Sequence, residues 1–267
     1  MKRPGDRART LALGTAGGAL IAFFALTVGA LLFTVPWGAV PRLVRDPLLL
    51  DAVFVSLVTT TISMAVVVTL GTPLAWLLAR RRARFATVIE VGLQLPEAIP
   101  PAVAGLALLL AFGRQGVLGG LLAGQGSIDV SLAFTPVAVV FAQIFVGGPF
   151  FVQAALAAFR RIDDDLLGVA RSLGAGPFAT FRRVVLPMSA SGLLGGLGLA
   201  WARALGEFGA TLMFAGNFSG RTQTLPLAVY AALESDLATA QVTAVVLLFL
   251  AVTLLLTVRL LGRRAGM

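Results

Sequence analysis

The sequence predicts an all-α, polytopic membrane protein that forms a single domain over residues 1–267. Of its residues, 58% are apolar and 12% charged, whereas about a quarter of an ordinary soluble domain is charged. A helix needs about 20 mainly apolar residues to cross a bilayer, and six runs meet that length. They are Leu11–Val35, Ala52–Ala79, Ala86–Phe112, Leu132–Ala158, Leu186–Met213 and Leu237–Leu261. The segments between them leave no room for a sizeable soluble domain.

Basic residues gather on one side of this predicted topology. With a cytoplasmic N-terminus, the cytoplasmic segments Lys2–Arg9, Arg80–Arg84, Arg160–Arg183 and Arg259–Arg264 carry sixteen of the 21 lysines and arginines. Four lie on the other side, and Arg203 lies inside the fifth run. Such an excess is typical of cytoplasmic loops. We therefore expect both termini in the cytoplasm, and the net charge of +9 indicates a membrane topology rather than a nucleic-acid partner.

The first run follows a basic leader, MKRPGDRART. A cleaved signal peptide also has a basic leader, but its apolar region is typically about 7–15 residues long. The run at 11–35 is longer, so we expect a retained helix and keep the signal peptide as the alternative. Gly14 and Gly18 here, and Gly192 and Gly196 in the fifth run, have the spacing of close helix contacts.

Three prolines interrupt the third run. Pro96, Pro100 and Pro101 each lack an N–H and crowd the preceding turn, so the helix must kink or break. The broken span needs internal partners, and we expect it to face protein or a water-filled path. Glu97 lies in the broken part and Glu90 nearer the cytoplasmic end. An ionisable group at this depth is either a functional candidate or a polar partner of the broken backbone.

The segment after the fourth run carries the signals of a short cytoplasmic helix. Three aspartates at 163–165 offer an N-cap and a favourable charge at its start. Leu166, Ala170 and Leu173 repeat at helical spacing, and Gly174 supplies a left-handed stop. A Gly-Pro pair then begins a second helix. The pattern fits a knob that enters a partner's groove, and it also fits an ordinary amphipathic surface loop.

The composition excludes several chemistries. The chain has no cysteine and no histidine, which removes thiol chemistry, disulfides and the usual zinc, haem and iron–sulfur ligand sets. Its only lysine is Lys2, so it has no P-loop, which needs a lysine after a glycine-rich loop. If ATP drives this protein, another chain binds it. The twelve acidic residues are mostly scattered over loops, and an integral membrane enzyme would need a cluster of catalytic residues.

The short helical segment resembles the EAA loop of ABC-transporter permeases. Three residues separate Gly168-Val169-Ala170 from Gly174, and nine more lead to VVLP, which ends at Leu186-Pro187. The resemblance implies a type I importer permease in which this loop is a coupling helix on a separate ATPase. The implied coupling residues are Leu166, Gly168, Val169, Ala170, Arg171, Leu173, Gly174, Leu186 and Pro187. Gly168 departs from the family pattern, which usually has glutamate there as a contact to the ATPase.

Two further stretches resemble the permeases of molybdate importers, with tungstate and sulfate importers as relatives. They are RALGEFGATLMFAGN at Arg203–Asn217 and TQTLPLAVY at Thr222–Tyr230. With LPEAIPPAVAGLALLL, the likeness covers roughly 51–259 and leaves 11–35 as an additional N-terminal helix. It implies two permease copies in a bacterial or archaeal cytoplasmic membrane and two ATPase subunits that bind ATP and Mg. An extracytoplasmic binding protein would deliver the oxyanion, and this chain would hold no cofactor.

Six residues are candidates for the translocation path or gate, namely Arg203, Glu207, Thr211, Asn217, Glu97 and Thr60. Arg203 and Glu207 are four residues apart, so one helix face can hold them as a structural ion pair or as a gate. Glu207 is a poor ligand for a dianion because like charges repel in a low dielectric. Neutral donors suit an oxyanion better, among them Thr59, Thr60, Thr61 and Ser63, unless these hydroxyls bond their own helix backbone.

A secondary transporter driven by an ion gradient is the alternative from another class. Such proteins often have repeated halves with interrupted helices in corresponding positions. Only the third run shows an interruption in the sequence, and we expect no matching break in the other half. The sequence therefore favours the ATP-driven importer.

Overall fold

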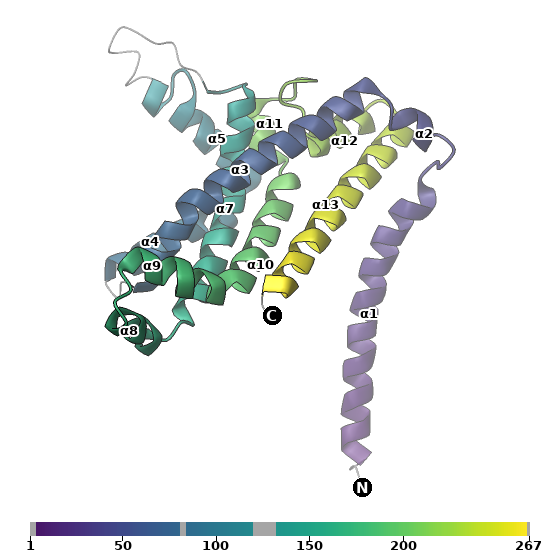
Figure 1. Ribbon diagram of the computed structural model, residues 1–267. Helices are drawn as coiled ribbons and strands as arrows, with labels where there is room; N and C mark the ends of the chain where they lie inside the picture. The colour runs from purple at the N-terminus through teal and green to yellow at the C-terminus, as the bar shows by residue number, and fades with distance from the viewer. Residues whose placement is uncertain (1–3, 81–83, 120–131, 266–267) are drawn as a thin grey trace.

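The computed structural model describes residues 4–80, 84–119 and 132–265, and the regular elements with assigned bounds in these ranges are helical (Figure 1). They are α1 (Pro4–Thr34), α2 (Val40–Leu43), α3 (Pro47–Arg80), α4 (Arg84–Ala98), α5 (Pro101–Phe112), α7 (Pro136–Arg160), α8 (Asp164–Ser172), α9 (Pro177–Thr180), a π-helical turn (Phe181–Val185), α10 (Leu186–Leu205), α11 (Gly209–Ala215), α12 (Leu225–Leu233) and α13 (Leu237–Ala265). Six helical stretches of the described ranges are long and apolar enough to cross a membrane, as predicted.

Capping decides where several of these helices begin. The fourth span starts at Pro136 rather than at Leu132, because the Thr135 hydroxyl accepts a hydrogen bond from the Ala138 N–H and proline suits the first turn. The last span starts at Leu237, as predicted, behind Asp236. Hydrogen bonds from the Thr239 hydroxyl and from the N–H groups of Ala238 and Thr239 lower the pKa of Asp236.

The predicted break of the third span is confirmed. Helix α4 ends at Ala98 and α5 begins at Pro101. Between them Pro100 has an extended backbone, with φ −54° and ψ 139°. Pro96 is accommodated inside α4, so the break comes at the Pro100-Pro101 pair.

The prediction of one uninterrupted fifth span over 186–213 is wrong at both ends. Helix starts already at Pro177 and continues through the π-helical turn into α10. At the other end α10 stops at Leu205, and α11 resumes at Gly209 in a separate short helix. The expectation that the second half holds no break is therefore also wrong. The sequence signal was there in the pair of glycines, Gly206 and Gly209, that flank the interruption.

Helices α3, α7 and α10 form the centre of the bundle, with two apolar clusters along it. The first joins Trp76 and Phe159 to Ala200 of α10, towards the end that carries α8. The second joins α5, α7 and α11 around Val139 and Phe214. Helix α10 comes close to α7 because Gly192 and Gly196 have no side chain at the contact. A Cβ on Gly192 would stand 2.7 Å from the Ala158 Cβ, and one on Gly196 would stand 2.5 Å from the Ala154 Cβ.

Helix α1 stands apart from the bundle (Figure 1). A Cβ on Gly14 or Gly18 would meet no atom within 4 Å, so the close contact expected of this pair is absent from the described chain. At its far end α1 approaches α13, where Gln241 donates to the Thr34 hydroxyl at 3.2 Å. Both termini lie at the end of the molecule that carries α8 (Figure 1), which is the end that the basic segments predict to be cytoplasmic.

Candidate functional sites

Helix α8 forms as its capping residues predict. The Asp163 carboxylate accepts a hydrogen bond from the Asp165 N–H at 3.0 Å, with Asp164 and Asp165 in the first turn. The helix ends before Gly174, whose φ of +82° is the left-handed conformation expected there. The chain therefore builds a nine-residue helix that is capped at its start and stopped at its end.

The buried face of α8 differs from the predicted apolar stripe. Leu167, which the sequence did not single out, is only 2% exposed and packs into the cluster around Phe159. Leu166 is 44% and Leu173 82% exposed, while Ala170 is half-buried. The predicted stripe thus lies mainly on the outer side, with Leu167 as the anchor of the helix.

The outer side of α8 combines apolar groups with open space. Val169 is 58% exposed, and Arg171 is also exposed. A Cβ on Gly168 would meet no atom within 4 Å, so the position is open to a partner or to a larger side chain. Together Leu166, Val169 and Leu173 form an apolar surface that the described part of the chain leaves uncovered.

Leu186 and Pro187 lie within helix rather than in a loop. Pro187 has no N–H to donate to the carbonyl of the preceding turn. The π-helical turn directly before it shifts the pattern by one residue, so that the Leu186 N–H bonds to the Phe181 carbonyl. Leu186 is half-buried and Pro187 exposed. These two residues therefore shape the start of α10, while Leu166, Val169 and Leu173 face outward.

Arg203 and Glu207 form an ion pair at the break in the fifth span. Arg203 Nη1 donates to Glu207 Oε2 at 2.7 Å, and Glu207 is 1% exposed. The other oxygen of Glu207 accepts from the Ala210 N–H at 2.8 Å. Both carboxylate oxygens are thus bonded, and the pair joins the end of α10 to the first turn of α11.

The breaks of the third and fifth spans lie against each other. A Cβ on Gly209 would stand 2.7 Å from the Pro101 Cβ, and one on Gly105 2.6 Å from the Met213 Cβ. Helix α11 therefore packs closely on α5, with only hydrogen atoms at the points of contact. The resumed parts of two interrupted spans form one unit on the far side of the breaks.

The hydroxyls of α3 are engaged inside the protein. Thr60 donates to the Ser56 carbonyl at 2.6 Å and Thr59 to the Val55 carbonyl at 2.7 Å. Ser63 donates to Gln143 Oε1 at 3.0 Å, and Gln143 Nε2 donates to the Thr59 hydroxyl at 3.1 Å. Gln143, missed in the sequence, is one of two amides in the apolar run 132–158, the other being Gln153, and an amide in such a run signals a buried polar partner.

The other candidates fall into separate places. Glu97 accepts from Gln153 Nε2 at 2.7 Å between α4 and α7, and Glu90 pairs with Arg160 nearby. Thr211 lies in α11, four residues after Glu207 in the chain, and its buried hydroxyl has no hydrogen-bond partner among the described residues. The same holds for Oδ1 of Asn217. The structure therefore pairs Arg203 with Glu207, bonds Thr60 to its own helix backbone and places Glu97 in a contact between α4 and α7.

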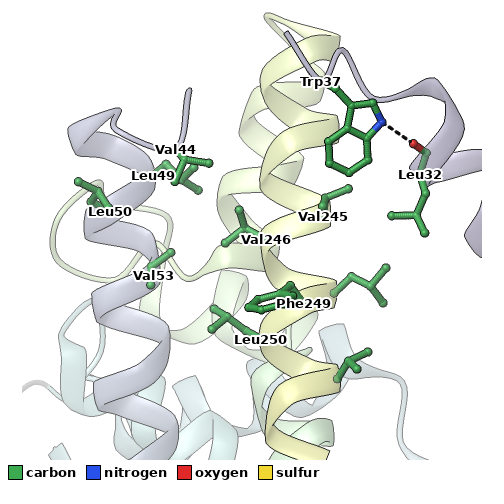
Figure 2. Close-up of a pocket in the computed structure, with 12 residues that line it drawn as sticks. Leu32, Trp37, Val44, Leu49, Leu50, Val53, Val245, Val246, Phe249 and Leu250 are labelled. Carbon is green, nitrogen blue, oxygen red and sulfur yellow. Dashed lines mark hydrogen bonds between the residues drawn. The ribbon is translucent and has the colours of Figure 1, made fainter. Parts of the chain in front are cut away.

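A groove of about 620 Å³ between α1, α3 and α13 is unsuited to a charged solute (Figure 2). Its lining consists of aliphatic and aromatic side chains, among them Leu49, Val246 and Phe249. The indole N–H of Trp37 is bonded to the Leu32 carbonyl at 3.1 Å. An oxyanion would find no free donor in this lining, and it would lose its hydration.

Comparison with known proteins gives a consistent picture. Residues 71–266 match the model of the family described as binding-protein-dependent transport system inner membrane component. The molybdenum transport system permease protein ModB of Mycobacterium tuberculosis is 41% identical over 230 residues, which are 86% of this chain and 85% of that protein. The sulfate transport system permease protein CysT of Salmonella typhimurium is 31% identical and is covered to 93%, with 96% of this chain matched.

Solved structures share the fold at low sequence identity. A bacterial ABC transporter involved in the import of alginate matches with a TM-score of 0.75 at 16% identity, over 97% of this chain and 98% of that one. The inward-facing methionine ABC transporter MetNI matches with a TM-score of 0.65 at 19% identity, over 82% of this chain and 97% of that one. These likenesses cover the bundle and carry no information on the substrate.

Proposed function

The chain belongs to the family of binding-protein-dependent transport system inner membrane components, and from this membership we propose that it forms the molybdate path of an ATP-driven importer. It is an ABC importer permease and a multi-pass protein of the cytoplasmic membrane. The observation that carries the substrate is the 41% identity to a molybdenum permease, against 31% to a sulfate permease. Tungstate and sulfate are the alternatives within the same family.

The proposal gives each partner a place. ABC importer permeases of this family work with an ATPase and a periplasmic binding protein. Here two copies of the chain pair in the membrane, with both termini and α8 in the cytoplasm. Two ATPase subunits bind ATP and Mg and carry out hydrolysis, while this chain holds no cofactor. A soluble binding protein outside the membrane delivers molybdate to the end that carries α12.

Coupling to the ATPase is assigned to the outer side of α8. Leu166, Val169 and Leu173 present an uncovered apolar surface, and Leu167 fixes the helix to the bundle. A short helix of this kind fits a hydrophobic groove of a partner. Gly174 keeps the helix short and turns the chain back toward α9. Gly168 stands where the family usually has a glutamate, so the contact with the ATPase depends on apolar side chains instead of a carboxylate.

The gate is assigned to the unit that α5 and α11 form beyond their breaks. Broken helices supply points where a bundle can bend. Arg203 and Glu207 bridge one of these points, so the ion pair holds the gate in the arrangement that the structure has. When ATP draws the ATPase subunits together, the motion reaches α11 through α10.

Thr211 and Asn217 are the donors that we assign to the translocation path. The Thr211 hydroxyl, which can donate, is buried and has no hydrogen-bond partner among the described residues, and the same is true of Oδ1 of Asn217, which can only accept. An oxygen of this kind costs free energy unless it is bonded in another state of the transport cycle. The Thr211 hydroxyl can donate to an oxyanion without the repulsion that Glu207 would exert. Asn217 can do so only through Nδ2 of its amide, because its unpartnered Oδ1 is an acceptor. Thr60 bonds the backbone of its own helix, and Glu97 joins α4 to α7.

Vesicles that contain this chain, its ATPase and the binding protein test the function. We expect uptake of labelled molybdate only when ATP is present on the side of the membrane that carries the ATPase subunits and the binding protein is present on the other side. The same uptake measurement is made with sulfate and with tungstate. Preferential uptake of sulfate would overturn the substrate assignment. Uptake driven by an ion gradient without ATP would overturn the ATP-driven mechanism.

A further inference from the structure

The end of α3 meets the coupling helix although the chain does not connect them. Helix α8 continues from α7 through residues 161–163, and it leads through α9 into α10. Helix α3 instead ends at Arg80, close to α8 and α9 in Figure 1. Any force that passes from α8 to α3 therefore has to pass through side chains.

Arg80 makes this connection with several parts of its side chain. Its Nη1 forms a salt bridge with Asp164, the first residue of α8. Its Nη2 donates to the Phe159 carbonyl at the end of α7 at 3.4 Å. The guanidinium also lies over the ring of Trp76, with Cζ 4.4 Å from the ring centroid. A planar guanidinium is suited to binding a carboxylate and stacking on an indole at once.

Trp76 extends the connection into the bundle. Its ring centroid is 5.5 Å from that of Phe159 in α7 and 5.4 Å from that of Phe181 in the π-helical turn. Phe159 is fully buried. Because these rings interdigitate in a packed core, a displacement of one moves the others. The salt bridge itself is partly solvated, so its role is in geometry more than in stability.

The opposite end of α3 is tied to a different element. The Ser56 hydroxyl oxygen accepts a hydrogen bond from the Leu225 N–H, the first residue of α12, at 2.8 Å, and both residues are buried. Between the two ends, Gln143 bonds to Thr59 and Ser63 and fixes α3 against α7. At 1.5 Å per residue, Ser56 and Arg80 are about 36 Å apart along the helix.

We propose that Arg80 is a positioning residue that makes α3 a second transmission rod, from α8 to the start of α12. This inference rests on the coupling role proposed for α8 and adds a route beside α10. The displacement of α8 pulls Asp164, Arg80 follows, and α3 carries the motion to Ser56 and Leu225. The loop with Asn217, which leads into α12, then moves together with α11.

The test compares Arg80→Ala and Asp164→Ala with a matched control, Arg160→Ala. Arg160 pairs with Glu90 of α4 and, among the described residues, makes no hydrogen bond or salt bridge to α8. Each variant is measured in vesicles of the whole complex as molybdate imported per ATP hydrolysed. We expect this ratio to fall about three- to ten-fold for Arg80→Ala and Asp164→Ala, and to stay at the wild-type value for Arg160→Ala.

The outcomes separate this inference from the proposed function. Wild-type ratios for both Arg80→Ala and Asp164→Ala would overturn the rod. A loss in Arg80→Ala alone would also overturn it, because only the contact with Trp76 would then matter. Asp164 is exposed and is not the capping residue, so Asp164→Ala leaves the fold of α8 intact. A wild-type complex without ATP-dependent uptake would instead refute the coupling role of α8.

A distance measurement gives a second readout. The chain has no cysteine, so cysteines introduced at Leu77 of α3 and Ser172 of α8 carry the only spin labels of the chain. Both positions are exposed. We expect the same Leu77–Ser172 distance with and without ATP in the wild type, and a changed or broadened distance with ATP in Arg80→Ala. A distance that changes with ATP already in the wild type would show that α3 and α8 move independently.

Discussion

The carboxylate of Glu207 lies 2.7 Å from the guanidinium of Arg203, across the point where the fifth span stops and resumes. Burial of a carboxylate in a membrane protein is costly unless the group is paired. Here the second oxygen also binds the Ala210 N–H, so the same side chain neutralises Arg203 and starts α11. The ion pair and the break are one feature.

Glu207→Gln should destabilise the protein because it removes the partner of the Arg203 guanidinium. Glutamine keeps an acceptor for Ala210 but leaves Arg203 unpaired. Removing one partner of a buried pair costs about 3–5 kcal/mol, and the partial exposure of Arg203 reduces this to about 2 kcal/mol. Thermal unfolding of the complex in detergent should show the loss. The double variant Arg203→Gln with Glu207→Gln should recover part of the lost stability. An equal loss of stability in the single variant Glu207→Gln and in the double variant would contradict the ion pair.

Gly105→Ala should disturb the contact between α5 and α11. The added Cβ would stand 2.6 Å from the Met213 Cβ and 2.8 Å from the Ala210 carbonyl oxygen, and such overpacking costs about 1–3 kcal/mol. Gly92→Ala in α4 is the control, because a Cβ there meets no atom within 4 Å. A helical Gly→Ala change in open space stabilises by about 0.5–1 kcal/mol. The two melting temperatures should therefore move in opposite directions.

Leu173→Glu and Leu167→Ala should separate binding from folding in α8. Leu173 is 82% exposed, so a charge there leaves the fold unchanged but should prevent docking of the ATPase. Leu167 is buried, and its truncation costs about 2–5 kcal/mol. Melting temperature and co-purification of the ATPase are the two measurements. Full ATPase binding by Leu173→Glu would show that the partner covers another face.

Gly174→Val should impair coupling while the bundle stays folded. A β-branched residue is strained at the φ of +82° found there, although its Cβ would meet no atom within 4 Å. The strain shifts the end of α8 instead of clashing with a neighbour. We expect less molybdate imported per ATP, with Gly176→Ala as the control, because Gly176 has a φ of −66° and a Cβ there meets no atom within 4 Å. Unchanged import by Gly174→Val would place the stop of the coupling helix elsewhere.

Local signals were sufficient for part of the candidate sites. The aspartate cap, the stop at Gly174 and the break at Pro100-Pro101 follow from backbone chemistry that each residue carries with it. Other positions needed the neighbouring helices. Nothing local distinguishes Leu167 from Leu166, because both are leucines one residue apart and only the packing of the cluster around Phe159 decides which of them is buried. Gln143 likewise gains its role only where α7 meets Thr59 and Ser63.

The amino-acid sequence alone determined the class of protein, the number of spans, their basic flanks and the short capped helix between two of them. These properties depend on hydrophobic length and on the conformational limits of single residues. The tertiary structure decided that the fifth span breaks at Glu207, that this break lies against the one at Pro101, and that Arg80 ties α3 to α8. Contacts between residues far apart in the chain exist only once the helices have packed.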